Sequence, residues 1–167
     1  YGNVLTPTVV MDNNSTVTNE GKMEITTLGN NRGTFINNST LIVKGDFDNE
    51  GVLTIGTNGT MYVAGTLSNL NASDVINLYG KILLTDPDNP SGTSAKTFDN
   101  GGTINGFGGG VSGSSGAQWT NDGTITGIAY VCGSNVTYTD NNPPNGAVTN
   151  NCCFLLTANA GPNIPIC

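Results

Sequence analysis

Acidic residues at alternate positions are the first candidates for chemistry in this chain. The segment Asp46-Phe47-Asp48-Asn49-Glu50-Gly51 begins like a calcium-binding loop, with acids at every second position and glycine at the sixth. An EF-hand loop also needs a bidentate glutamate at its twelfth position, where this chain has Thr57. In an extended strand the three acids would share the outward side. We therefore interpret them as a solvated face.

A second acidic group lies in the segment from Thr85 to Gly92, which has the composition of a turn. We expect this segment to project as a loop. Asp86, Asp88 and Asn89 could together bind Ca²⁺ there, because calcium prefers carboxylate and amide oxygens. Calcium is the only cofactor for which the sequence offers ligands.

Enzymatic chemistry needs residue types that this chain lacks. It has no histidine, and Arg32 is its single arginine. Polysaccharide lyases need a cationic base or charge neutraliser beside carboxylates, and hydrolases need paired acids across a cleft. Neither set can be assembled, so we expect no catalytic residues and no enzyme.

The charge balance excludes further classes. Twelve acidic residues against five basic ones give a net charge of −7, and the basic residues are scattered, so no nucleic-acid footprint exists. No apolar run is long enough to span a membrane. Only 10% of residues are charged, which favours a secreted or cell-surface protein with an Asn-, Thr-, Ser- and Gly-rich exterior. The start, Tyr1-Gly2-Asn3, indicates a processed product or an excised fragment.

All four cysteines lie in the last part of the chain. They lack the paired spacing of a zinc site and have no histidine, so we expect two disulfides, one of which could join subunits. A bond within the adjacent pair would strain the backbone, so each of its members should pair with one of the outer two, in an order that the sequence leaves open. The residues are Cys132, Cys152, Cys153 and Cys167.

An internal repeat shows which elements must position these residues. Phe35, Asn37, Ser39, Leu41 and Val43 share one side of a strand, and the same order returns twenty residues later from Ile55 to Val63. The match continues between Val43-x-Gly45-x-Phe47-x-Asn49 and Val63-x-Gly65-x-Leu67-x-Asn69. The repeat therefore covers a whole unit.

The template apolar-x-Asn-x-Gly-x-apolar recurs in steps of 18 to 22 residues, with copies that begin at 17, 35, 55, 76, 98 and 119. This period with β-type alternation predicts an all-β fold, a β-solenoid (β-helix) of about six coils, with a Greek-key β-sandwich as the alternative. The template predicts that its apolar residues form one column inside the core. These are Phe35, Ile55, Ile76, Phe98 and Trp119.

The asparagines of the template have inward parity. We expect them to lie near a corner and to form partial amide ladders, from Asn19 to Asn37 and from Asn100 to Asn121. The glycine-rich segment 106–116 is predicted to be a second projecting loop, flexible by composition.

Three segments follow from this organisation: residues 1–16 as an N-terminal cap or exchange strand, 17–140 as the solenoid, and 141–167 as a cysteine-containing C-terminal extension. Apolar residues in the two outer segments are candidates for assembly by strand addition. They are Val9, Val10, Met11, Phe154, Leu155, Leu156, Ile164 and Ile166.

The ending Ala158-x-Ala160-Gly161-Pro162-Asn163-x-x-x-Cys167 resembles the opening strand of Ig-like or PKD-like repeats in secreted surface proteins of the Bacteroidota. The Asn- and Gly-rich coils resemble the β-helical segments of such adhesin-like proteins. The resemblance implies a cell-surface or extracellular filament protein, with strand exchange or chain linkage at the C-terminus. This chain stops where an Ig-like domain would continue.

These observations predict a non-catalytic structural subunit of an extracellular fibre or surface adhesin. Its main partners would be copies of itself, joined head to tail through the uncovered ends of the solenoid. The alternatives are a monomeric stalk or binding module of a larger adhesin, with surface glycans or a host cell surface as partner, and a carbohydrate-binding or carbohydrate-active β-helix.

Overall fold

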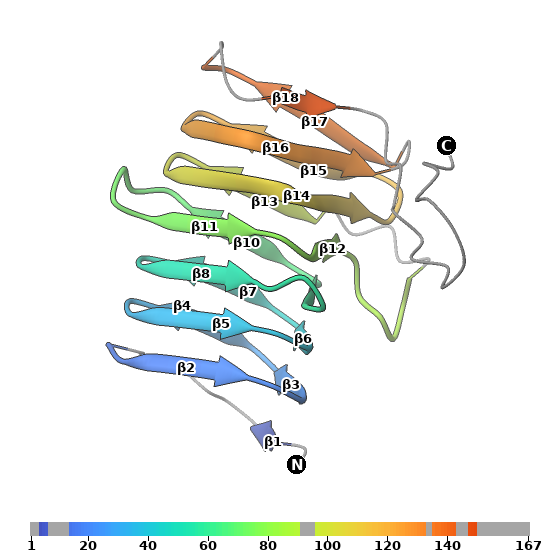
Figure 1. Cartoon of the computed structure of the whole chain (residues 1–167). Helices are drawn as coiled ribbons and strands as arrows, with labels where there is room; N and C mark the ends of the chain where they lie inside the picture. The colour runs from blue at the N-terminus through green and yellow to red at the C-terminus, as the bar shows by residue number, and fades with distance from the viewer. Residues whose placement is uncertain (1–3, 7–13, 91–95, 133–134, 143–146, 150–167) are drawn as a thin grey trace, which may run out of the picture.

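The computed structural model describes residues 4–6, 14–90, 96–132, 135–142 and 147–149. Every regular element in these ranges is a β-strand, and the strands pair in parallel. Successive turns of the chain lie on one another to form a β-solenoid of about six turns (Figure 1). The predicted solenoid is therefore confirmed, and the sandwich, which requires antiparallel pairing, is excluded.

Each turn of the solenoid has three sides, which we call faces 1, 2 and 3. Faces 1 and 2 belong to one sheet, because two long strands continue from one face to the other. Face 1 consists of β2 (Thr16–Asn19), β5 (Thr34–Asn37), β8 (Val52–Ile55), β11 (Val75–Leu78) and the first parts of β14 (Thr103–Gly113) and β16 (Thr124–Cys132).

Face 2 begins at the strand nearest the N-terminus and ends with the later parts of β14 and β16. The short strand β18 (Ala147–Thr149) pairs with the middle of β16. The other strands of face 2 are β1 (Val4–Thr6), β3 (Lys22–Ile25), β6 (Thr40–Val43), β9 (Thr60–Val63) and β12 (Lys81–Leu84).

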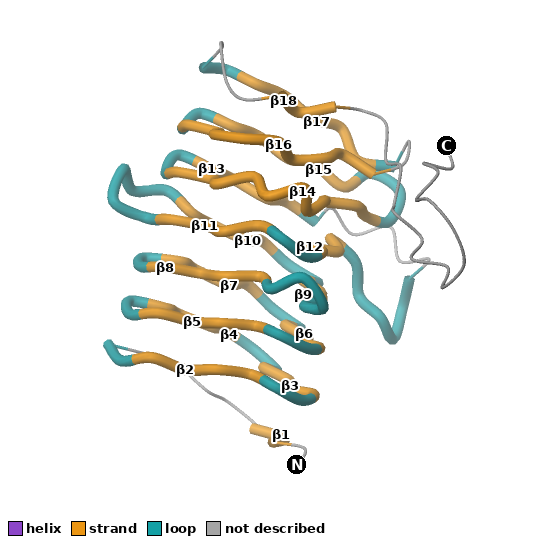
Figure 2. The backbone as a smooth tube through the Cα atoms, viewed as in Figure 1, coloured by secondary structure: helices purple, strands orange, loops and turns teal. Residues whose placement is uncertain are grey.

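Face 3 forms the second sheet. Its strands are β4 (Leu28–Asn31), β7 (Asp46–Asn49), β10 (Thr66–Asn69), β13 (Thr97–Asn100), β15 (Ala117–Asn121) and β17 (Val136–Asp140). Figure 2 shows that short turns connect the faces at the corners, with a longer loop after β12.

The core is narrow and follows from strand alternation. Most of the strands are four residues long and bury the second and fourth, so each contributes few side chains to the interior. Large side chains stack from turn to turn on face 3, where the rings of Phe98 and Trp119 lie 5.3 Å apart and nearly parallel. Tyr138 continues this column against the edge of Trp119.

The predicted single column of apolar residues is wrong, although all five side chains are fully buried in one core. Phe35 pairs with Leu53 on face 1, and Ile55 lies beside Asn37. Ile76 continues the face 1 column. Phe98 and Trp119 belong to face 3.

Two features of the chain explain this error. The motif Asn-x-Gly occurs at two different corners of the solenoid, since Asn19 ends the face 1 strand β2 and Asn100 ends the face 3 strand β13. In addition, four residues separate β8 from β9 whereas two separate β5 from β6. The twenty-residue match is therefore correct for β6 and β9 but displaced by two residues for β5 and β8.

Buried asparagines form a continuous ladder at the corner between faces 3 and 1. Each side-chain NH₂ donates to the side-chain oxygen of the next turn, over distances of 2.6 to 3.0 Å. The predicted bonds from Asn19 to Asn37 at the other corner and from Asn100 to Asn121 are both present. The full ladder runs through Asn31, Asn49, Asn69, Asn100 and Asn121 and ends at Asp140.

The prediction of a flexible loop at 106–116 is wrong. Most of this segment lies in β14, which pairs with strands on both sides. The glycines permit close stacking, because a Cβ at Gly106 would lie 2.5 Å from the carbonyl group of Ile128. Gly108 has a φ of 84° where β14 turns the corner. Glycine content here reflects tight packing of backbone on backbone.

The segments outside the main stack are described in part. β1, in the predicted N-terminal cap or exchange segment, pairs with β3 of its own chain. The loop after β12 is described as far as Pro90. The candidate assembly residues Val9, Val10, Met11, Phe154, Leu155, Leu156, Ile164 and Ile166 lie outside the described residues. In the part of the chain that is described, no helix is long and apolar enough to cross a membrane.

Candidate functional site

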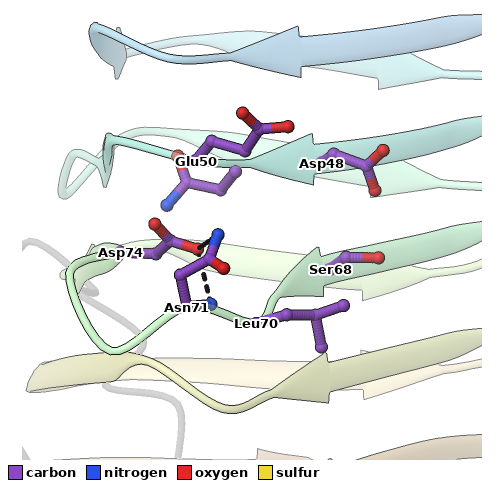
Figure 3. Close-up of a pocket in the computed structure, with 7 residues that line it drawn as sticks. Asp48, Glu50, Ser68, Leu70, Asn71 and Asp74 are labelled. Atoms are coloured by element: carbon purple, nitrogen blue, oxygen red, sulfur yellow. Dashed lines mark hydrogen bonds between the residues drawn. The ribbon is translucent and has the colours of Figure 1, made fainter.

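A shallow cavity of about 200 Å³ opens at the corner between faces 3 and 1. It exists because five residues connect β10 to β11, whereas two connect β7 to β8, so the longer connection bulges outward. Figure 3 shows Asp48 and Ser68 on neighbouring strands beside this bulge. The cavity is lined by Asp48, Asn49, Glu50, Ser68, Leu70, Asn71 and Asp74.

Two of the carboxylates at this cavity, Asp74 and Glu50, accept hydrogen bonds from the chain's own donors. Asp74 is buried and accepts hydrogen bonds from the backbone and the side chain of Asn71, which closes the bulge (Figure 3). Glu50 accepts a hydrogen bond of 3.0 Å from Arg32 and one of 3.2 Å from Asn30. The cavity is also smaller than typical ligand pockets, which exceed about 300 Å³. The hydrogen bonds of Asp74 and Glu50 stabilise this corner of the solenoid.

The two acids proposed as calcium ligands hold an ammonium group. Lys44, directly after the face 2 strand β6, donates to Asp86 at 3.0 Å and also to Asp88. Asp86 accepts a further bond from the backbone N–H of Asp88. A calcium ion at this loop would have to displace Lys44.

The same contacts shift two pKa values. The hydrogen bond from the Asp88 backbone, followed by Lys44, lowers the pKa of Asp86. Burial acts to lower the pKa of Lys44, but the two carboxylates outweigh it and the net shift is upward. The ion pairs of Lys44 with Asp86 and Asp88 therefore hold the loop against face 2 at neutral pH.

No metal centre is formed by the described residues, because no three His, Cys, Asp or Glu side chains among them lie close enough to share an ion. In the segment resembling an EF-hand, Asp46 is exposed and accepts from the backbone N–H of Thr66. This contact ties adjacent turns of face 3 together.

The cysteines are only partly described. Cys132 ends β16, is 5% exposed and is disulfide-bonded, with its partner outside the described residues. Cys152, Cys153 and Cys167 also lie outside them. The pairing of the two expected disulfides stays a prediction.

One surface feature has no counterpart in the sequence reasoning. Tyr79, Phe107 and Ile128 lie on adjacent turns at the corner between faces 1 and 2, with 41%, 52% and 47% of their surface exposed. The rings of Tyr79 and Phe107 stack with centroids 4.2 Å apart. We call these three residues the apolar ridge. Phe107 lies in the glycine-rich segment that was predicted to be a loop. It follows Thr103 and Asn105 at alternate positions, and this alternation is typical of the outward side of a strand.

Similarity to known proteins adds no family to this geometry. No family model, no curated protein and no solved structure matches the chain.

Proposed function

We propose that this chain is a non-catalytic, stiff stalk or binding module of a secreted or cell-surface adhesin. The observation that carries the proposal is the asparagine ladder, which joins the turns from Asn31 to Asp140 through buried hydrogen bonds. Such a ladder fixes the stacking of every turn it reaches. At the cavity beside β10, Arg32 and Glu50 join adjacent turns, and Asn71 and Asp74 close the bulge.

Two contacts favour a monomeric module over a head-to-tail fibre. β1 already pairs with β3 of its own chain, which argues against the exchange of this strand with another copy. Asp140 accepts from Asn121 and from the backbone N–H of Asn142, and an aspartate has no amide N–H with which to continue the ladder. The ladder therefore has a natural end at Asp140.

A fibre subunit that assembles end to end by strand addition is the second candidate. Among the described strands, those that pair on one side only are β1, β2, β4, β17 and β18. Such edges can accept a strand from another chain. Copies joined in this way would form an open filament unless their rotation closed a ring.

Sedimentation velocity over a wide concentration range, with electron microscopy of the same samples, separates the two candidates. We expect monomers. Uniform fibres with a subunit-length repeat that disappear when residues 154–167 are deleted would favour the fibre subunit over the monomeric module. Release of reducing or unsaturated sugar ends from a polysaccharide panel would overturn the non-catalytic part of the proposal.

A further inference from the structure

Face 1 differs from the other two faces in charge. Its outward residues in the described strands are all neutral, whereas face 2 presents Lys22 and Lys81 and face 3 presents Asp46, Asp48 and Asp99. The neutral set is Thr16, Thr18, Thr34, Ile36, Val52, Thr54, Val75, Asn77, Thr103, Asn105, Thr124 and Thr126. A chain with net charge −7 thus keeps one flat side free of charge.

Beside the apolar ridge, this face carries a ladder of neutral hydrogen-bonding groups. Asn77 donates to the hydroxyl of Thr54 at 3.2 Å, and Asn105 donates to the oxygen of Asn77 at 2.9 Å. The hydroxyl of Thr126 donates to Asn105 at 2.8 Å. Each amide uses one N–H in the ladder and has a second, so a ligand can still be bound by amides held in fixed positions.

The apolar ridge has Tyr79 at one end, with 41% of its surface exposed. Phe107 covers one side of Tyr79. On the preceding turn, Leu78 pairs with Ile55, and the backbone N–H of Tyr79 donates to the carbonyl of Ile55. The residue that follows Ile55 is Gly56, which has no side chain.

We propose that the apolar ridge, with Asn77, Asn105 and Thr126, binds a neutral polysaccharide chain. A sugar ring offers C–H groups for the exposed aromatic surface of Tyr79 and Phe107 and hydroxyls for the amide ladder, and it needs no charged partner. This inference rests on the proposed function, because it names the class of surface that the module contacts.

The size of the surface favours a glycan over a protein. Turns about 4.8 Å apart and alternate residues about 6.6 Å apart give these three turns an area on the order of 200–300 Å². A stable protein interface buries about 800 Å² on each partner. A chain of sugar rings needs only a strip.

Affinity electrophoresis tests the inference with a panel of soluble neutral polysaccharides, a β-glucan, a xylan and a mannan, with polygalacturonate as the anionic comparison. Binding to insoluble cellulose and chitin is measured by co-sedimentation. We expect retention by at least one neutral polysaccharide. Tyr79→Leu, which keeps an apolar side chain but removes the ring, should weaken binding about tenfold.

Tyr62→Leu is the matched control, because Tyr62 is an outward aromatic residue on face 2. It should change binding less than about twofold, and thermal unfolding confirms that both variants fold. Phe107→Leu, which removes the second ring of the ridge, should also weaken binding. No retention by any neutral polysaccharide, retention by polygalacturonate alone, or equal binding by Tyr79→Leu would overturn the inference.

Sedimentation equilibrium completes the test. If the parent chain forms a dimer that the Tyr79→Leu substitution dissociates, the apolar ridge is an interface between two copies, and the proposal of a glycan ligand is overturned. A monomer that binds no neutral polysaccharide would overturn this inference while leaving the stalk proposal standing.

Discussion

Asn69 donates a hydrogen bond of 2.6 Å to the side chain of Asn100, although 31 residues separate them. The other steps between asparagines of this ladder span 18 to 21 residues. The intervening chain contains both the bulge after β10 and the loop after β12. Insertions therefore leave the stack at its corners, and the ladder keeps the turns in register across them.

Loss of one ladder amide should destabilise the fold strongly. Asn69→Ala would leave the buried oxygen of Asn100 without its donor and remove the acceptor of Asn49. We expect the free energy of unfolding to fall by about 2–3 kcal/mol, measured by denaturant titration. Asn77→Ala, an amide in the partly exposed ladder on face 1, is the control and should cost about 1 kcal/mol or less. Equal losses of unfolding free energy in the two variants would contradict the prediction that the buried ladder stabilises the fold more than the exposed one.

Two aspartates should respond to pH with opposite signs. Burial, and then the negative charge of Asp122, raises the pKa of Asp99 above 3.8. The folded state thus holds its proton more tightly than the unfolded state, and Asp99 costs stability as pH rises through this range. Asp99→Asn should raise the melting temperature at pH 7 by on the order of 1–3 °C, and the gain should vanish below the unfolded pKa.

Asp86 supplies the opposite case. Its lowered pKa means that the ionised carboxylate stabilises the fold above the unfolded value of 3.8, and that this contribution is lost as pH falls through the folded pKa. Asp86→Asn should therefore lower the melting temperature at pH 7. Melting curves of both variants at pH 7 and pH 3 check the pair. A shift of the same sign for both would refute the assignment.

The fold could be predicted because strand alternation and the period near twenty residues are local properties of the sequence. The assignment of Phe98 and Trp119 to the column of Phe35 failed for a physical reason. Two different corners use the same residues, an amide to bond along the stack and a glycine to let backbones approach, with Asn19 and Asn37 at one corner and Asn100 and Asn121 at the other. One template therefore describes two places, and only the three-dimensional winding separates them.

The candidate site was less accessible to sequence reasoning. The charge-free side of the molecule combines residues from turns separated by 18 to 28 positions, so no single segment displays it. Tyr79 and Phe107 become neighbours because their strands pair in parallel. Composition in turn suggested a loop at 106–116, because it cannot distinguish glycine that permits flexibility from glycine that permits close packing.

The cysteines give a chemical prediction. Cys132 is disulfide-bonded, and four cysteines allow two disulfides. Titration of the unfolded, unreduced chain with a thiol reagent should detect no free thiol, and four should appear after reduction. Four reactive thiols before reduction would refute the prediction, and peptide mapping under non-reducing conditions would establish the pairing.

The glycine-rich segment gives the last prediction. If residues 106–116 formed a flexible loop, alanine at Gly106 would be tolerated. In the solenoid its Cβ would lie 2.5 Å from the carbonyl group of Ile128 and 2.8 Å from the backbone nitrogen of Ala129 on the next turn. Neither backbone atom can move without disturbing the pairing of β14 and β16. Gly106→Ala should therefore lower the free energy of unfolding by about 1–3 kcal/mol.

Gly21→Ala is the matched control, because nothing lies within 4 Å of the place that its methyl group would take, and it should be neutral or stabilise by up to about 1 kcal/mol. Equal unfolding midpoints for the two variants would restore the loop interpretation.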